Sequence, residues 1–108
     1  MKKVNILGHI LNVAFNMAVE IEYEEMSGQP FDIENMSTQK ATMQLCYASL
    51  KESNDKMPFK FDELKAKVTM EEWVALKNAV IEAMTEWFHI PVVMQEDEHQ
   101  KGEDGKNS

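Results

Sequence analysis

The chain has 108 residues, of which 44% are hydrophobic, and its 19 acidic side chains outnumber its 11 lysines to give a net charge of −8. This length and composition predict one small folded domain. An acidic chain without arginine lacks the basic patch that nucleic-acid binding requires and the bidentate clamp common in phosphate sites, and no stretch is apolar for long enough to predict a membrane span.

The first predicted element is a β-hairpin. Two apolar-rich stretches, 3–7 and 10–15, flank Gly8 and His9, which is the pattern of two strands joined by a tight turn. Polar residues interrupt the apolar stretch and no small-residue cleavage site follows it, so we interpret the N-terminus as mature structure and not as a signal peptide.

Two helices are predicted next. Asn16 is a good N-cap for a helix that runs to Ser27, with Gly28 and Pro30 ending it. After a short connection, Ser37 is the expected cap of a helix over 38–53, with Asn54 ending it in the left-handed conformation. Apolar residues occupy two sides of this second helix, which predicts a central position in the fold.

The C-terminal third predicts helices and a tail. An extended piece around Pro58 leads to one or two helical turns through Val68 that Asp62 caps, and the sequence leaves open whether 59–61 adds a third strand. Thr69 and Glu72 predict a capping box for a last helix over 70–88, which Pro91 prevents from continuing. We therefore expect an α+β, mostly helical fold: a hairpin, three main helices, an optional short fourth one, a single globular domain over 1–92 and a disordered acidic tail over 93–108.

The four glutamates of the first helix are the most conspicuous charge cluster. At 100° per residue, Glu20 and Glu24 lie about 40° apart and Glu22 and Glu25 about 60° apart, and the two pairs point to nearly opposite sides. They cannot converge on one metal ion. The alternatives are a solvated or salt-bridged face, a docking surface and, third, a catalytic role, for which the sequence supplies no partner group. We expect a lysine from elsewhere to offset the two glutamates nearest the C-terminal end.

Lys77 lies in the middle of the apolar face of the last helix, where an unpaired charge would be costly to bury. Its stem can cover apolar surface while its ammonium reaches solvent. Otherwise it pairs with Glu22 or Glu25, or its face is partly open and binds a partner. These alternatives stay open.

Aromatic and methionine side chains are abundant for so small a domain. Most of them are expected in the core, yet such residues also suit adaptable binding surfaces, and self-association is a reasonable expectation. The candidate protein-binding residues lie on the first and last helices: Glu20, Glu24, Trp73, Lys77, Trp87 and Phe88.

Residues able to do chemistry do not cluster in the sequence. The three histidines are scattered, Cys46 is the only cysteine, and no glycine-rich phosphate loop is present, so we expect no catalytic site, cofactor or metal. A lone cysteine and the lack of a signal peptide favour the cytoplasm.

The order of these features resembles the tail assembly chaperones of long-tailed bacteriophages, especially the small type of siphophages and prophages. The family's hairpin pattern "I-x-G-x-x-Y/L-x-V-x-F-N" and its "E-x-x-x-G-x-x-F-D" element, "L-x-Y-A-x-L-K" run and "F-x-F-D-E" segment all have counterparts over 4–88. The matching residues are Ile6, Gly8, Leu11, Val13, Phe15, Asn16, Glu24, Gly28, Phe31, Asp32, Leu45, Tyr47, Ala48, Leu50, Lys51, Phe59, Phe61, Asp62 and Glu63.

These motifs are packing and capping motifs, and none carries chemistry. The resemblance implies a non-enzymatic chaperone that coats the tape-measure protein and recruits tail-tube subunits in the host cytoplasm, tends to oligomerise and is absent from the virion. The alternative is a generic acidic interaction module, such as a small regulator or an inhibitor that mimics nucleic-acid charge; a small enzyme is the third hypothesis.

Overall fold

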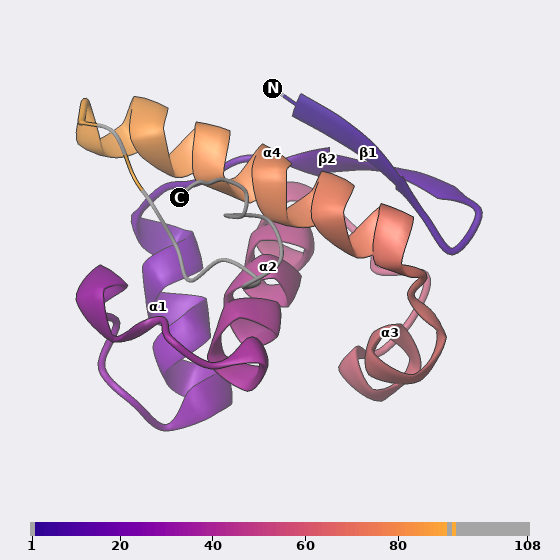
Figure 1. Ribbon diagram of the computed structural model, residues 1–108, viewed down its shortest axis with the longest axis horizontal. Helices are drawn as coiled ribbons and strands as arrows, with labels where there is room; N and C mark the ends of the chain where they lie inside the picture. The colour runs from indigo at the N-terminus through magenta and orange to yellow at the C-terminus, as the bar shows by residue number, and fades with distance from the viewer. Residues whose placement is uncertain (1, 91, 93–108) are drawn as a thin grey trace, which may run out of the picture.

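The computed structural model describes residues 2–90 and 92. It has an antiparallel hairpin, β1 (Lys2–Ile6) and β2 (His9–Val13), followed by α1 (Met17–Ser27), a 3₁₀ turn η1 (Ile33–Asn35), α2 (Gln39–Ser53), α3 (Phe61–Lys67) and α4 (Met70–Phe88). The predicted α+β, mostly helical class with a short additional helix is confirmed. Figure 1 shows α4 lying across α1 and α2, with the hairpin at one side of α4 and α3 set apart from the other helices.

The hairpin turn lies one residue earlier than predicted. Ile6 pairs with His9, so Leu7 and Gly8 form the two-residue turn, and both have positive φ, 52° and 82°. A turn of this type requires positive φ at both positions and favours glycine at the second, which explains why Gly8 occupies the second place and not the first. The backbone N–H of Leu7 then donates to Glu72 Oε2 at 3.0 Å, which ties the turn to the start of α4.

Side chains of α2 cover the outer edge of β2. Ser49 Oγ donates to the carbonyl of Ala14 at 2.7 Å, and the Ala14 N–H donates to Ser53 Oγ at 2.9 Å. Asn54 accepts from the Asn12 N–H and donates to the Asn12 carbonyl, both at 3.0 Å. Because these bonds satisfy the backbone groups of an edge strand, they leave no room for a further strand, and the sheet of the described residues has two strands.

The same hydrogen bonds explain why the predicted conformation at the C-terminal end of α2 is wrong. Asn54 is extended, with φ −131°, and not left-handed, since its side chain is held against β2 and also donates to the Leu50 carbonyl at 2.8 Å. At the other end of α2, Thr38 and not Ser37 is the N-cap: its side chain accepts from the Ala41 N–H.

The start of α3 also differs from the prediction. The N-cap is Lys60, without a side-chain cap bond, and not Asp62. The Tyr47 hydroxyl donates to the Phe59 carbonyl at 2.8 Å, and the Tyr47 ring meets the Phe61 ring edge-on at 5.7 Å between centroids. The helix therefore begins at Phe61, where that ring packs on α2, one residue before Asp62, the side chain best suited to cap it.

The other predicted helix signals are confirmed. Asn16 caps α1, Gly28 ends it in the left-handed conformation, and Thr69 with Glu72 forms the capping box of α4. The α2 helix is central as expected, with seven buried residues from Thr42 to Leu50. α4 ends at Phe88, with His89 left-handed as its C-cap; the predicted stop at Pro91 and the predicted tail over 93–108 lie outside the described residues.

Candidate protein-binding surface

Four aromatic rings fix the C-terminal end of α4 to the loop that follows α1. Phe88 lies 5.9 Å from Phe15 and stacks on Phe31 at 6.4 Å between centroids, and Phe31 also contacts Phe15 and Tyr23. Phe88 is therefore half-buried. Because neighbouring residues of a helix point about 100° apart, Trp87 is turned away from this cluster.

Trp87 meets the first helix at the molecular surface. Its indole Nε1 donates to Glu20 Oε2 at 3.1 Å, so two of the residues predicted for partner binding are brought together from positions 67 residues apart. Three large apolar side chains within three residues of Glu20 or Trp87 in the sequence are exposed, as is Trp87 itself: Met17 by 53%, Ile21 by 49%, Trp87 by 39% and Ile90 by 60%. We call Met17, Glu20, Ile21, Trp87 and Ile90 the Trp87 surface.

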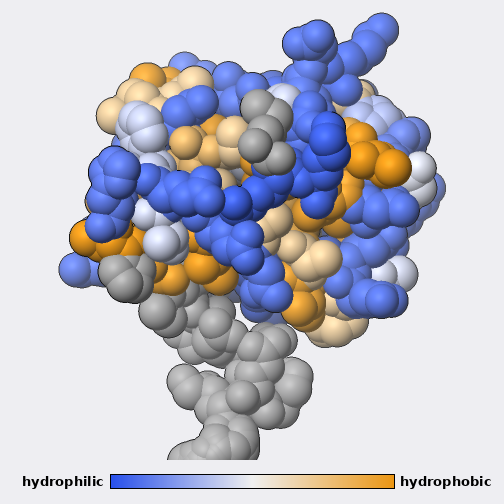
Figure 2. All heavy atoms as spheres, turned by 90° about the horizontal axis from the view of Figure 1, so that it is seen from above, coloured by the Kyte–Doolittle hydropathy of each residue, from blue (hydrophilic) through white to orange (hydrophobic). Residues whose placement is uncertain are grey.

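A shallow hollow adjoins this surface. It has a volume of about 260 Å³, with Trp87, Phe15 and Ala83 on its wall and the Lys2–Glu86 ion pair, 2.8 Å long, at its edge. Figure 2 shows the molecule from the side of α4 and the hairpin, where hydrophobic side chains form separate patches between hydrophilic ones. A partner side chain seated in the hollow would contact apolar atoms with a charged pair close by.

The glutamates of α1 have separate structural roles. Glu22, whose side chain is only 12% exposed, pairs with Lys51 of α2 at 2.8 Å, and this hydrogen bond raises the pKa of Lys51. Glu24 accepts the backbone N–H of Phe31 at 2.8 Å and so shapes the loop after α1. The expected lysine thus offsets Glu22 and not the glutamates at the end of the helix, because α2 packs beside Glu22.

Trp73 and Lys77 are buried, 4% and 3% exposed. The Lys77 ammonium lies 5.5 Å from the centroid of the Trp73 ring, a cation–π contact, and no ion pair joins it to a carboxylate in the described residues. Lys77 thus neither reaches solvent nor pairs with Glu22 or Glu25. Of the six predicted binding residues, Glu20 and Trp87 belong to this surface. Glu24 holds the loop after α1, Phe88 is half-buried in the aromatic cluster, and Trp73 and Lys77 lie in the interior.

Sequence reasoning missed Met17, Ile21 and Ile90. All three are apolar, and Met17 and Ile21 stand one helical turn apart beside Glu20. Their exposure depends on where α4 crosses α1, which periodicity alone does not give.

Groups with catalytic potential are few and separate. Burial raises the pKa of the Cys46 thiol, with a smaller opposing effect from Lys77, so the thiol stays protonated near neutral pH. Among residues 2–90 and 92, no three His, Cys, Asp or Glu side chains come together as metal ligands. In the same part of the chain, no helix combines the length and apolar character needed to cross a bilayer.

Comparisons with protein-family models, curated proteins and solved structures find no match to this chain.

Proposed function

We propose that this protein is a tail assembly chaperone of a long-tailed bacteriophage, which binds the tape-measure protein and helps to recruit tail-tube subunits in the host cytoplasm. The observation that carries the proposal is the Trp87 surface: exposed apolar side chains beside a carboxylate, held by two helices. Such a surface suits transient binding of an amphipathic helix, because apolar contacts supply affinity and charge supplies selectivity.

The sequence motifs support the proposal independently. The hairpin, the stop of α1, the central helix and the segment before α3 occur in the order typical of that family. In this fold the same motifs hold the scaffold together: Phe15 and Phe31 belong to the aromatic cluster, and Tyr47 fixes Phe59. A tape-measure protein is long and helical in this family, so it offers many apolar stripes to a small domain.

The charge of the chain favours a partner with basic side chains next to its apolar ones. Glu20 lies on the Trp87 surface, and the whole chain has a net charge of −8. A helix that places Lys or Arg one turn from Leu or Ile would match this arrangement. The acidic interaction module remains the alternative, with a partner unrelated to phage tails.

Gene neighbourhood and co-expression test the proposal together. A very long tape-measure gene is expected just downstream and a tail-tube gene upstream. Co-expression with that tape-measure protein is expected to raise the fraction of it found in the soluble lysate. Absence of both genes, or equal solubility with and without this chain, contradicts the proposal.

A further inference from the structure

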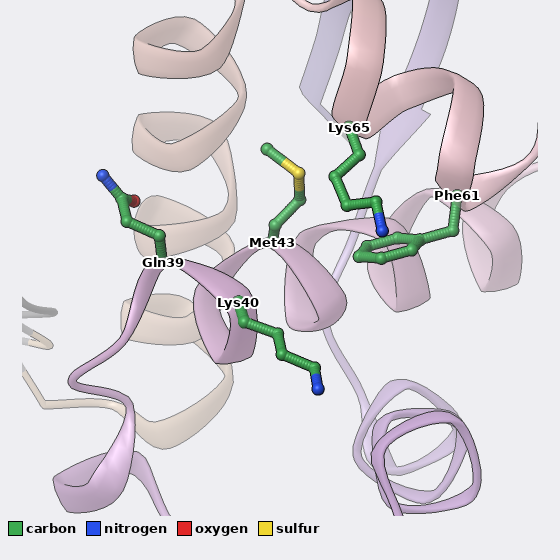
Figure 3. Close-up of a pocket in the computed structure, with 5 residues that line it drawn as sticks. All are labelled: Gln39, Lys40, Met43, Phe61 and Lys65. Atoms are coloured by element: carbon green, nitrogen blue, oxygen red, sulfur yellow. The ribbon is translucent and has the colours of Figure 1, made fainter.

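A groove without acidic side chains lies between the first turns of α2 and the short helix α3. Its lining residues are Gln39, Lys40, Met43, Phe61 and Lys65, and its cavity volume is about 430 Å³. Figure 3 shows Lys65 folded over the ring of Phe61, with Met43 beside them. A cavity of this size falls in the range that holds drug-sized molecules, so side chains of a peptide segment have room in it.

The two lysines of the groove are available for further contacts. Lys40 is exposed and makes no ion pair with any described residue. The Lys65 ammonium lies 5.5 Å from the Phe61 ring centroid and 3.4 Å from an Asp62 oxygen, and the Asp62 side chain is 89% exposed. An ion pair open to solvent contributes little, so Lys65 can bind a second carboxylate. The groove therefore favours carboxylates attached to aliphatic groups that can cover Met43 and Phe61.

Two other hollows of the molecule suit an acidic ligand less well. The hollow beside Trp87 has a carboxylate, that of Glu86, at its edge. A hollow of about 520 Å³ next to α3 has two, those of Asp62 and Glu63, on its wall. A carboxylate that entered either hollow would meet a like charge, which is unfavourable. Charge therefore favours the α2–α3 groove as the site for an acidic ligand.

The segment 93–108 of this chain has the complementary charge. It contains five acidic residues and two lysines, and three of the acids are consecutive: Glu96, Asp97 and Glu98. A glutamate side chain has two methylene groups before its carboxylate, so its stem can lie on an apolar wall while its oxygens reach an ammonium. The segment thus offers the combination that the groove favours.

The described chain ends close enough for this segment to reach the groove. Val92 donates its backbone N–H to Thr85 Oγ1 at 3.2 Å, and Thr85 follows Lys77 by about 12 Å along α4. Lys77 lies close enough to Cys46 of α2 to act on its thiol, and Met43 precedes Cys46 by one turn, about 5 Å. With about 9 Å between the axes of packed helices, this path is about 30 Å long. The segment can span about 50 Å when extended, so it reaches the groove without strain.

We propose that the α2–α3 groove binds the acidic segment 93–108 of the same chain, with carboxylates of the segment on Lys40 and Lys65. Each exposed ion pair is weak, but a segment joined to the domain binds at an effective concentration in the millimolar range. A carboxylate on a separate molecule lacks this advantage. The segment therefore covers the groove in the free protein. This inference does not depend on the tail assembly role.

Paramagnetic broadening in NMR spectra of the full chain tests the contact. A nitroxide label on Gln100→Cys lies within the segment, and the buried thiol of Cys46 is not expected to take up the label. Amide signals over 39–43 and 61–65 are expected to lose most of their intensity relative to the reduced label, and those over 2–4 and 17–21 to lose much less. High salt is expected to reduce the loss, since exposed charges are screened.

Charge reversals on each side of the contact test its chemistry. K40E/K65E, made in the labelled chain, is expected to reduce the loss over 39–43 and 61–65 to the level of 17–21, and E96K/D97K/E98K is expected to do the same. Combining both sets of changes restores opposite charges and is expected to restore the loss. The matched control K56E/K60E changes the net charge as much as K40E/K65E does, but outside the groove, and is expected to behave like the parent. Circular dichroism checks that every variant is folded.

A mixture of two chains distinguishes the segment of the same chain from that of a second copy. An isotope-labelled chain without nitroxide is mixed with a nitroxide-labelled chain of natural isotope abundance. The isotope-labelled chain is expected to keep its signals over 39–43 and 61–65, because its groove holds its own segment. The proposal is overturned if these signals are lost in the mixture as in the single chain, if the single chain shows no selective loss, or if K40E/K65E leaves that loss unchanged. Failure of the combined charge reversal to restore the loss also overturns it.

Discussion

The two tryptophans of α4 differ although they lie on one helix. Trp73 is 4% exposed and has the Lys77 ammonium over its ring, whereas Trp87 is 39% exposed and donates its indole N–H to Glu20. The hairpin runs beside α4, with its turn tied to Glu72 and Lys2 paired with Glu86, and the last turn of α4 reaches Glu20 of α1 (Figure 1). The same helix thus contributes to the core at one end and to a surface at the other.

Because both residues are tryptophans, their different roles follow from their positions on α4. Near Trp73 the hairpin turn is tied to Glu72, and Leu76, Lys77, Ala79 and Val80 of the next two turns are buried. Near Trp87, Met84 is buried and Phe88 packs on Phe15, but the indole is left at the surface with its N–H on Glu20. An aromatic side chain in the second environment suits binding, because it offers apolar area with few rotatable bonds.

Truncation of the two tryptophans is expected to give the largest difference in stability between any two variants of α4. Trp73→Ala removes a buried ring and is expected to lower the free energy of unfolding by about 3–5 kcal/mol. Trp87→Ala is expected to lower it by less, about 1–2 kcal/mol, because 39% of that residue is already in solvent. Urea unfolding followed by circular dichroism measures both. Similar losses for the two variants would mean that Trp87 also belongs to the core.

Replacement of Lys77 tests whether its buried ammonium destabilises the fold. Burying an ammonium without a carboxylate costs several kcal/mol, and the cation–π contact returns only about 2 kcal/mol. Lys77→Met keeps the side-chain length and a favourable contact with the Trp73 ring. We therefore expect the free energy of unfolding to rise by about 1–2 kcal/mol.

The matched control is Lys51→Met, which removes the partner of Glu22. It is expected to lower the free energy of unfolding by about 1 kcal/mol or less. If Lys77→Met destabilised the protein as much as Lys51→Met, the ammonium would be better satisfied than the structure indicates.

Glu72, at the Trp73 end of α4, makes the stability of the fold depend on pH. Its carboxylate accepts the backbone N–H groups of Thr69 and Leu7, each at 3.0 Å, and these bonds, Thr69 first, hold its pKa below the ordinary 4.5. A depressed folded-state pKa gives stability that is complete above the unfolded value and is lost as pH falls through the folded value. The wild type should therefore weaken below pH 4.5.

Glu72→Gln keeps an acceptor oxygen but removes the charge. We expect it to lower the free energy of unfolding at pH 7 by about 0.5–1 kcal/mol, since charge-assisted bonds are about twice as strong as neutral ones. The loss of stability between pH 5 and pH 3, measured by urea unfolding, should be less steep than in the wild type. An unchanged slope would show that other carboxylates dominate.

The smallest effect on stability is expected at the contact between Glu20 and Trp87. Glu20→Ala removes the acceptor of the Trp87 indole, and an exposed contact of this kind contributes about 0.5 kcal/mol. The tryptophan fluorescence of Glu20→Ala should differ from that of the wild type because Trp87 loses its hydrogen-bond partner. Glu25→Ala, a matched loss of charge on α1, should leave the spectrum unchanged. A loss of stability above about 1 kcal/mol for Glu20→Ala would mean that this contact is structural.

Local signals in the sequence determined most of the scaffold. The Asn16 cap, the Gly28 stop and the Thr69–Glu72 capping box each depend on residues within four positions of one another, and each was predicted from its pattern. The turn at Leu7–Gly8 was misplaced by one residue because two registers satisfy the same apolar alternation.

Features that depend on distant residues were not predictable. Asn54 is extended because its side chain binds Asn12, 42 residues away. The candidate site was half found: Glu20 and Trp87 were chosen separately for charge and aromaticity, but nothing in the sequence places them 3.1 Å apart. Lys77 was identified as unusual, and only the packing of α4 shows that it lies over Trp73.

Amide hydrogen exchange of the complex with the tape-measure protein tests the central claim, that the Trp87 surface binds the partner. Partner binding is predicted to slow exchange in peptides over 17–24 and 84–90 and to leave the hairpin turn over 7–10 as it is. Unchanged exchange over 17–24 and 84–90, with slowing elsewhere, would contradict the account.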